Sequence, residues 1–118
     1  MGRRDRIGSA FRVVDPRLVG GKGGSYVVLY RFTDQGLKSI KDTVKRAAEV
    51  RKANEARGFK TIGTYWTQGQ YDIVSVIEAP DEESMNAGLF NIAAAGNVHS
   101  ETMRAYDESE MQKALDRA

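Results

Sequence analysis

The order of strand and helix patterns is the feature that most restricts the fold of this 118-residue chain. β-Branched and aromatic residues dominate four short segments, which is typical of strands. Apolar residues spaced three or four apart indicate helices between them. We predict strands over residues 26–32, 61–66, 71–78 and 98–106, one continuous helix from residue 34 to 57, and a second from residue 80 to 95.

Start and stop signals agree with these boundaries. Gly58 and Gly96 follow the two helical patterns, and glycine commonly ends helices because it adopts left-handed backbone conformations easily. The polar tetrad 67–70 predicts a hairpin turn between the second and third strands. Asp107 and Glu110 match a capping box, which predicts a short helix at the C-terminal end.

This β-α-β-β-α-β order with a C-terminal helix predicts an α+β fold, the ferredoxin-like βαββαβ plait. Both helical connections are long enough for right-handed crossovers. We divide the chain into a basic, Gly-rich N-terminal arm over residues 1–25 and a ferredoxin-fold domain over residues 26–118.

The strands are apolar on both sides. Val27 and Leu29 alternate with Val28 and other apolar or aromatic residues, and Val74 alternates with isoleucines in the same way. Two helices can cover only one face of a four-stranded sheet, so the other face would remain a large exposed apolar patch. The pattern therefore predicts a homo-oligomer, a dimer or larger, formed sheet to sheet by a two-fold operator.

Composition excludes several classes of site. The chain contains no cysteine and one histidine, which excludes disulfides and thiolate sites and disfavours structural zinc. We therefore expect no metal and no cofactor. No apolar run approaches the ~18 residues that a membrane span requires, and we expect a cytoplasmic protein without membrane contact.

Charge is unevenly distributed. The first 24 residues carry six Lys or Arg against two Asp, and the remainder carries twelve basic against fourteen acidic residues. A mildly acidic domain lacks the basic footprint of specific nucleic-acid binding. The arm is either a solvated extension or a docking segment for an acidic partner. Lys22 lies in a run of glycines, but the following segment is a predicted strand, which disfavours a phosphate loop.

Several separated motifs resemble the GYD domain family. They are Gly69-Gln70-Tyr71-Asp72, Val27-Val28-Leu29-Tyr30-Arg31-Phe32-Thr33-Asp34-Gln35-Gly36, Lys41-Asp42-Thr43, Glu78-Ala79-Pro80-Asp81 and Gly96-Asn97-Val98. The resemblance covers about residues 26–117. It implies a small prokaryotic dimeric α/β plait with no settled biochemical activity.

A weaker likeness links the chain to the effector-binding domains of leucine-responsive/AsnC-type transcription regulators. It rests on Gly69, Tyr71-Asp72, Asp81, Gly96-Asn97-Val98 and Thr102. The likeness implies a ferredoxin-like dimer that binds small molecules near subunit interfaces. The N-terminal 24 residues are too short and Gly-rich for a helix-turn-helix, so a stand-alone binding or assembly module is implied.

Seven polar or aromatic residues are candidates for ligand binding: Arg31, Tyr65, Trp66, Tyr71, Asp72, His99 and Arg104. Each has a structural alternative. Asp72 could hold a ligand amine or cap the hairpin, and Tyr71 could pack at an interface. The aromatic pair 65–66 could line a pocket or simply pack. His99 could act in acid-base chemistry, although a lone strand histidine is usually structural.

The two arginines lie within predicted strands, where a charge needs a partner. Arg31 and Arg104 could clamp a ligand carboxylate, or they could pair with Asp72, Glu78 or Glu101. Whether the chain is an enzyme stays open at this point, and no catalytic residue can be assigned.

Three function classes remain. The first is a non-enzymatic homo-oligomeric module for small-molecule binding or assembly, with a pocket at its interface. The second is a small cofactor-free dimeric α/β-barrel enzyme, of isomerase or monooxygenase type, which a buried cavity containing Trp66, Asp72 and His99 with a strongly shifted pKa would favour. The third is an accessory protein that docks a partner through its basic arm.

Overall fold

The computed structural model describes residues 23–118. Its elements are β1 (Gly24–Phe32), α1 (Asp34–Lys38), the 3₁₀ turn η2 (Ile40–Asp42), α2 (Thr43–Ala56), β2 (Lys60–Trp66), β3 (Ile73–Ala79), α3 (Glu82–Ala95), β4 (Val98–Ala105) and α4 (Glu108–Asp116). The prediction of an α+β fold is confirmed. The expectations for the basic arm fall mainly on residues 1–22, which lie outside the described residues.

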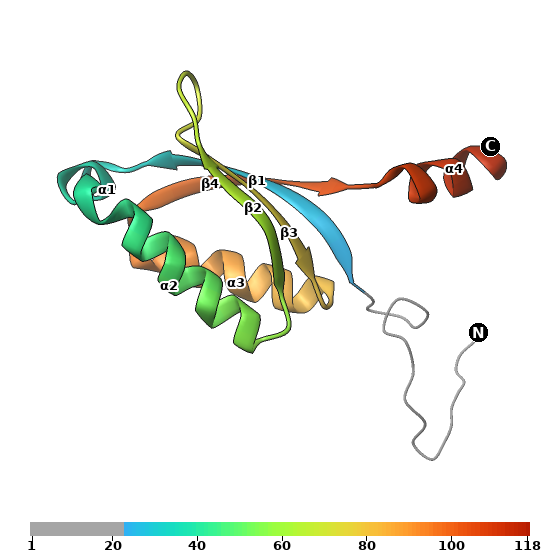
Figure 1. Ribbon diagram of the computed structural model, residues 1–118, viewed down its shortest axis with the longest axis horizontal. Coiled ribbons are helices and arrows are strands. Elements are labelled where there is room, and N and C mark those ends of the chain that lie inside the picture. Colours follow the sequence, from blue (N-terminus) through green and yellow to red (C-terminus); the bar gives the residue numbers. More distant parts are fainter. Residues whose placement is uncertain (1–22) are drawn as a thin grey trace, which may run out of the picture.

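The strands form one antiparallel sheet in the order β2-β3-β1-β4. Helices α2 and α3 both lie on one side of this sheet (Figure 1). No helix of the described part is long and apolar enough to cross a membrane.

The prediction of one continuous helix from residue 34 to 57 is wrong. The chain forms α1, η2 and α2 instead, because Ser39 leaves helical geometry at φ −112° and ψ 32°. Leu37 and Val44, which one continuous helix with this apolar spacing would place on its buried face, are 53% and 65% exposed. The break redirects the chain, so that α2 lies across the sheet and α1 lies at its end (Figure 1).

The predicted stop and start signals are confirmed. Gly58 and Gly96 follow α2 and α3 with φ of 91° and 81°, values that glycine adopts without steric cost. Asp107 and Glu110 form the reciprocal capping box that begins α4. The third strand begins at residue 73 rather than 71, so Tyr71 and Asp72 belong to the loop that joins β2 and β3.

The core lies between the sheet and the helices. Val28 in β1 is fully buried, and it packs in a cluster with Phe59, Ile77 from β3 and Met85 from α3. Val28 and Ile77 alternate along their strands with the residues of the opposite face. The helix layer is thin over β2 and β3, since none of the 14 residues of α2 is fully buried.

Helix α4 leaves the end of β4 and points away from the sheet (Figure 1). Its apolar side chains, Met111 and Leu115, are 50% and 55% exposed. An isolated helix shorter than ~12 residues is marginal in water even when it is well capped. The nine residues of α4 thus carry an apolar stripe that is about half exposed in the single chain.

Candidate functional site

The uncovered face of the sheet carries two cross-strand rows of apolar residues. In one row Val76, Val27 and Met103 are neighbours across β3, β1 and β4. In the next row Tyr65, Val74 and Leu29 are neighbours across β2, β3 and β1. The edge residues Met103 and Tyr65 are 48% and 60% exposed. The predicted apolar second face is therefore present, and α2 and α3 leave it uncovered.

A small pocket of about 180 Å³ opens at one end of this face. Its lining residues are Leu29, Arg31, Tyr71, His99, Ser100 and Glu101. The structure thus brings together three of the seven residues that the sequence predicts for ligand binding, namely Arg31, Tyr71 and His99.

Arg31, Tyr71 and Glu101 hold one another in this pocket. The Arg31 guanidinium lies 5.2 Å from the centre of the Tyr71 ring, and its Nη2 is 3.3 Å from Glu101 Oε2. The Tyr71 hydroxyl donates to Glu101 Oε1 at 2.9 Å. Arg31 therefore pairs with Glu101, one of the structural partners that the sequence allowed. The side chains of this ion pair are half exposed, which limits its contribution to about 0–1 kcal/mol.

Asp72 has a structural contact. Its Oδ2 accepts the backbone N–H of Phe32 at 2.9 Å, and its own backbone N–H donates to the carbonyl of Tyr30 at 2.8 Å. This carboxylate ties the loop between β2 and β3 to the end of β1. It does not line the pocket beside it.

Tyr65 and Trp66 lie on opposite faces of β2. Tyr65 belongs to the uncovered face, opposite Val74. Trp66 is paired with Ile73 on the helix side, and its indole Nε1 donates to Thr43 Oγ1 at 3.1 Å, at the start of α2. The aromatic pair therefore does not line a common pocket.

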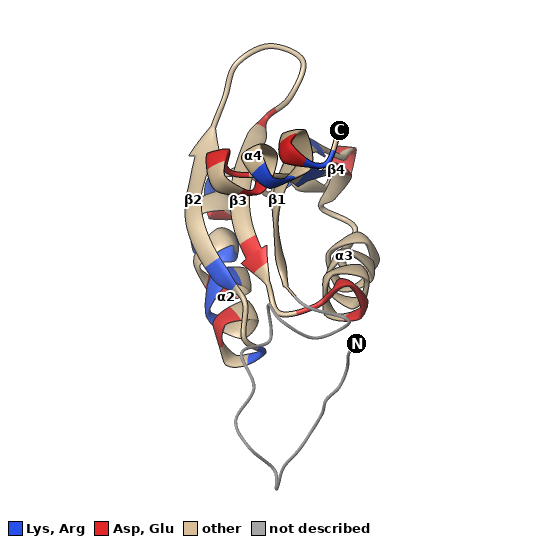
Figure 2. Ribbon diagram, turned by 90° about the vertical axis from the view of Figure 1, so that its right-hand side faces the viewer, with Lys and Arg blue, Asp and Glu red and all other residues tan. Residues whose placement is uncertain are grey.

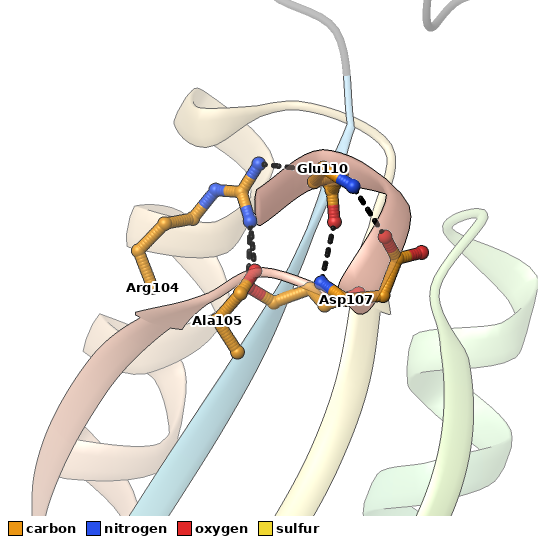
Figure 3. Close-up of polar contacts among 5 residues, drawn as sticks. Arg104, Ala105, Asp107 and Glu110 are labelled. Atoms are coloured by element: carbon orange, nitrogen blue, oxygen red, sulfur yellow. Dashed lines mark hydrogen bonds and ion pairs between the residues drawn. The ribbon is translucent and has the colours of Figure 1, made fainter. Parts of the chain in front are cut away.

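Arg104 joins β4 to α4. Its guanidinium pairs with Glu110 Oε2 at 3.6 Å, donates to the backbone carbonyls of Ser25 and Ala105, and lies 4.7 Å from the centre of the Tyr106 ring. Glu110 also accepts from the backbone N–H of Asp107 at 3.0 Å (Figure 3). Arg104 thus fixes the first turn of α4 relative to the end of the sheet.

The seven candidates do not form one site. His99 lines the sheet-face pocket, whereas Trp66 and Asp72 line neither this pocket nor the larger cavity described below, so neither of these two spaces brings the three residues together. Within residues 23–118 no group of three His, Asp or Glu side chains is placed to hold a metal ion.

A larger cavity, of about 240 Å³, lies between α2, α3 and the sheet. It contains none of the seven sequence candidates. Arg46, Arg51 and Arg57 line it from α2 and its C-terminal end, and no Asp or Glu of the described chain does. Its floor includes Tyr30, whose burial raises its pKa to about 12.

A sequence signal for this cavity exists. Where the helices cross the sheet, the positions that line the cavity include Ala47 and Ala53 in α2, Gly88 in α3, and Thr64 and Ser75 in the strands. Such small side chains cannot fill the ~10 Å between two layers. Helical spacing identifies which face of α2 points toward the sheet. It does not report side-chain volume, so it does not predict that these short side chains leave a cavity.

Two comparisons place the chain among known proteins. It is 29% identical over 82 residues to the glutamine synthetase and cystathionine beta-lyase binding protein of Thermus thermophilus, an alignment that covers 69% of this chain and 86% of the relative. The crystal structure of MtbAldR is similar with a TM-score of 0.58 at 15% identity, over 85% of this chain and 62% of that chain. This second likeness shows the fold alone, and the chain spans less than two thirds of that protein.

The family follows from the match along the domain itself. Residues 26–115 match the GYD domain, which includes all four strands from Tyr26 onward, the helices between them and most of α4. This confirms the resemblance carried by the Gly69–Asp72 motif, whose tyrosine lines the sheet-face pocket and whose aspartate ties the loop to β1. The chain is a member of the GYD domain family.

Proposed function

We propose that this protein is a non-enzymatic, homo-oligomeric binding and assembly module with a ferredoxin-like plait. Copies pair through the uncovered face of the sheet. The observation that carries the proposal is the pair of apolar rows on that face, with Val27, Leu29, Val74 and Val76 at the centre. Charged residues flank these rows at both ends, including Arg31, and an apolar centre with a polar rim is typical of protein interfaces.

Helix α4 supports pairing as well. Its apolar stripe extends beyond the sheet, where a second copy could cover Met111 and Leu115. Burial of apolar surface contributes ~25 cal/mol per Å², so a stripe and a sheet face together can offset the cost of association. Pairing across the sheet would also close the pocket around Arg31 and Tyr71, which makes it the proposed ligand pocket at the interface.

The partner class is suggested by the relative. The Thermus thermophilus protein is named as a binding protein of two enzymes, glutamine synthetase and cystathionine beta-lyase. By analogy, we propose that the assembled form of this chain docks metabolic enzymes, with glutamine synthetase as the first partner to test. We expect the protein to act in the cytoplasm.

Self-association is tested by sedimentation equilibrium. The wild-type protein should have a mass at least twice 13.1 kDa. Met103→Lys places a charge at the exposed edge of the apolar rows and should lower that mass toward one chain. Phe90→Lys is the matched control, because Phe90 is 74% exposed on α3 and lies away from the sheet face. A monomeric wild type, or equal effects of both variants, would contradict the proposal.

Partner binding is tested by sedimentation of a mixture. The protein is combined with purified glutamine synthetase from the same organism, and serum albumin serves as the control. We expect this protein to move with the enzyme and not with albumin, and Met103→Lys to weaken the complex if only the assembled form docks. Independent sedimentation of both proteins would contradict this partner.

A further inference from the structure

The cavity beneath α2 and α3 has a one-sided charge. Three arginines line it, and the described chain places no carboxylate there to balance them. They come from one side: Figure 2 shows basic residues along α2, whereas α3 carries charge only in its first turn. A partly enclosed space with one sign of charge concentrates ligands of the opposite sign. The cavity therefore favours an anion.

Arg46 has an unused donor. Its Nη1 donates to the backbone oxygen of Ser39 at 3.1 Å and to Ser39 Oγ at 3.0 Å, which fixes the guanidinium at the break between α1 and α2. Its Nη2 is buried and has no hydrogen-bond partner among the described residues. A buried donor without an acceptor is unfavourable, because it has lost its water partners without gaining a replacement. Because Arg46 lines the cavity, an acceptor placed there could satisfy this group.

The rest of the cavity is mainly apolar. Ile73 and Ile77 form the floor with Tyr30, and Leu89 and Ile92 form the wall on α3. In the floor, the hydroxyls of Thr64 and Ser75 lie 3.3 Å apart and can satisfy each other. Burial raises the pKa of Tyr30 to about 12, so its phenol stays neutral at ordinary pH. The charged end of a ligand is thus directed to the arginines and its body to the apolar floor.

We propose that this cavity binds a small monocarboxylate with an apolar body, whose carboxylate pairs with Arg46. The volume of about 240 Å³ is below the ~300–1,000 Å³ of drug-sized pockets, which suits a compact aliphatic or aromatic acid. Of the three arginines, Arg51 and Arg57 are exposed, and Arg46 has the buried nitrogen without an acceptor among the described residues. One such donor suits a singly charged carboxylate better than a phosphate dianion, which would require more donors. The site lies within one copy of the chain and is separate from the sheet-face pocket. Ligand binding there would be a property in addition to the proposed assembly function.

Octanoate is the probe, and octanamide and acetate are its controls. Binding is measured by titration calorimetry and by amide chemical shifts of the full chain. We expect octanoate to bind with a Kd below about 1 mM, octanamide at least tenfold more weakly, and acetate not detectably. This follows because charge-assisted hydrogen bonds contribute about 1.5–3 kcal/mol, which is roughly 10- to 100-fold in affinity.

Substitutions distinguish the contribution of the Arg46 charge to ligand affinity from the contribution of the cavity itself. Arg46→Gln should lower octanoate affinity at least tenfold and leave octanamide unchanged, and Arg46→Lys should restore part of the octanoate affinity. Lys45→Gln is the matched control, because it removes one charge from the same helix at an exposed position outside the cavity. Ala47→Leu should fill the cavity and abolish binding of both probes.

Each outcome decides the proposal. Equal affinities for octanoate and octanamide, equal effects of Arg46→Gln and Lys45→Gln, or no octanoate binding to the wild type would overturn it. Chemical shifts confined to the residues around Tyr71 would instead assign the acid to the sheet-face pocket and would also overturn it. Met103→Lys should leave octanoate affinity unchanged, so failure of assembly and failure of ligand binding are distinguishable.

Discussion

The carboxylate of Asp72 accepts the backbone N–H of Phe32 at 2.9 Å, across 40 residues of sequence. This contact holds the long loop between β2 and β3 against the end of β1. Charged acceptors give hydrogen bonds worth about 1.5–3 kcal/mol, so Asp72→Ala should lower the free energy of unfolding by about that amount. Urea denaturation at a fixed protein concentration measures the change.

Two further variants test whether the Asp72 hydrogen bond causes this loss of stability. Asp72→Asn keeps an acceptor oxygen and should cost less than Asp72→Ala. Glu49→Ala, at an exposed position of α2, should change the unfolding free energy by less than about 0.5 kcal/mol. If Asp72→Ala were as harmless as Glu49→Ala, the carboxylate would be free for the ligand role that the sequence also allows.

Two helical glycines should respond to alanine in opposite directions. At Gly88 in α3 a Cβ would meet only Phe59 Cζ at 3.7 Å, an ordinary contact, so Gly88→Ala should stabilise the fold by about 0.5–1 kcal/mol. At Gly36 in α1 a Cβ would collide with the Asn97 carbonyl oxygen. Gly36→Ala should therefore destabilise the fold by about 1–3 kcal/mol. Thermal denaturation of the two variants side by side checks the signs.

Helix α4 should matter for assembly and not for the fold of the single chain. Leu115→Ser removes an exposed apolar side chain from the stripe, and we expect the dimer dissociation constant to rise several-fold with unchanged far-UV circular dichroism. Lys113→Ser is the control on the same helix. Sedimentation equilibrium measures both. Identical dissociation constants would mean that α4 remains outside the oligomer interface.

Stability should fall in alkaline solution because of Tyr30. Burial raises its pKa from 10.0 to about 12, so between these values the unfolded chain loses the phenolic proton while the folded chain keeps it. The contribution of Tyr30 is complete below pH 10 and is lost as pH rises toward 12, by at most about 1.4 kcal/mol per pH unit. Urea denaturation of wild type and Tyr30→Phe from about pH 9 to 11.5 isolates this loss. Parallel curves would refute it.

The strands could be predicted from sequence because alternation is a local property. In β1, Val27 and Val28 point to opposite faces whatever the rest of the chain does, and the structure confirms this division. The break at Ser39 could not be predicted in the same way. Arg46, seven residues later, donates hydrogen bonds to Ser39 at the break, and the apolar spacing continues across it.

The candidate site was predicted in part for the same reason. Arg31 and His99 are paired across β1 and β4, and Tyr71 joins them from the neighbouring loop. The arginines of the helix-side cavity were missed. Their charges look like those of any solvated helix, and only the folded chain places Arg46 in the cavity lining with a buried nitrogen.

The alternation along β1 has a genetic consequence. Codons 27 and 29 encode side chains of the uncovered sheet face, whereas codons 28 and 30 encode side chains beneath the helices. In a saturation-mutagenesis library, tolerance along this strand should therefore oscillate with a period of two between separable phenotypes. Changes at codons 27 and 29 should affect self-association. Changes at codons 28 and 30 should affect solubility and binding of the carboxylic acid.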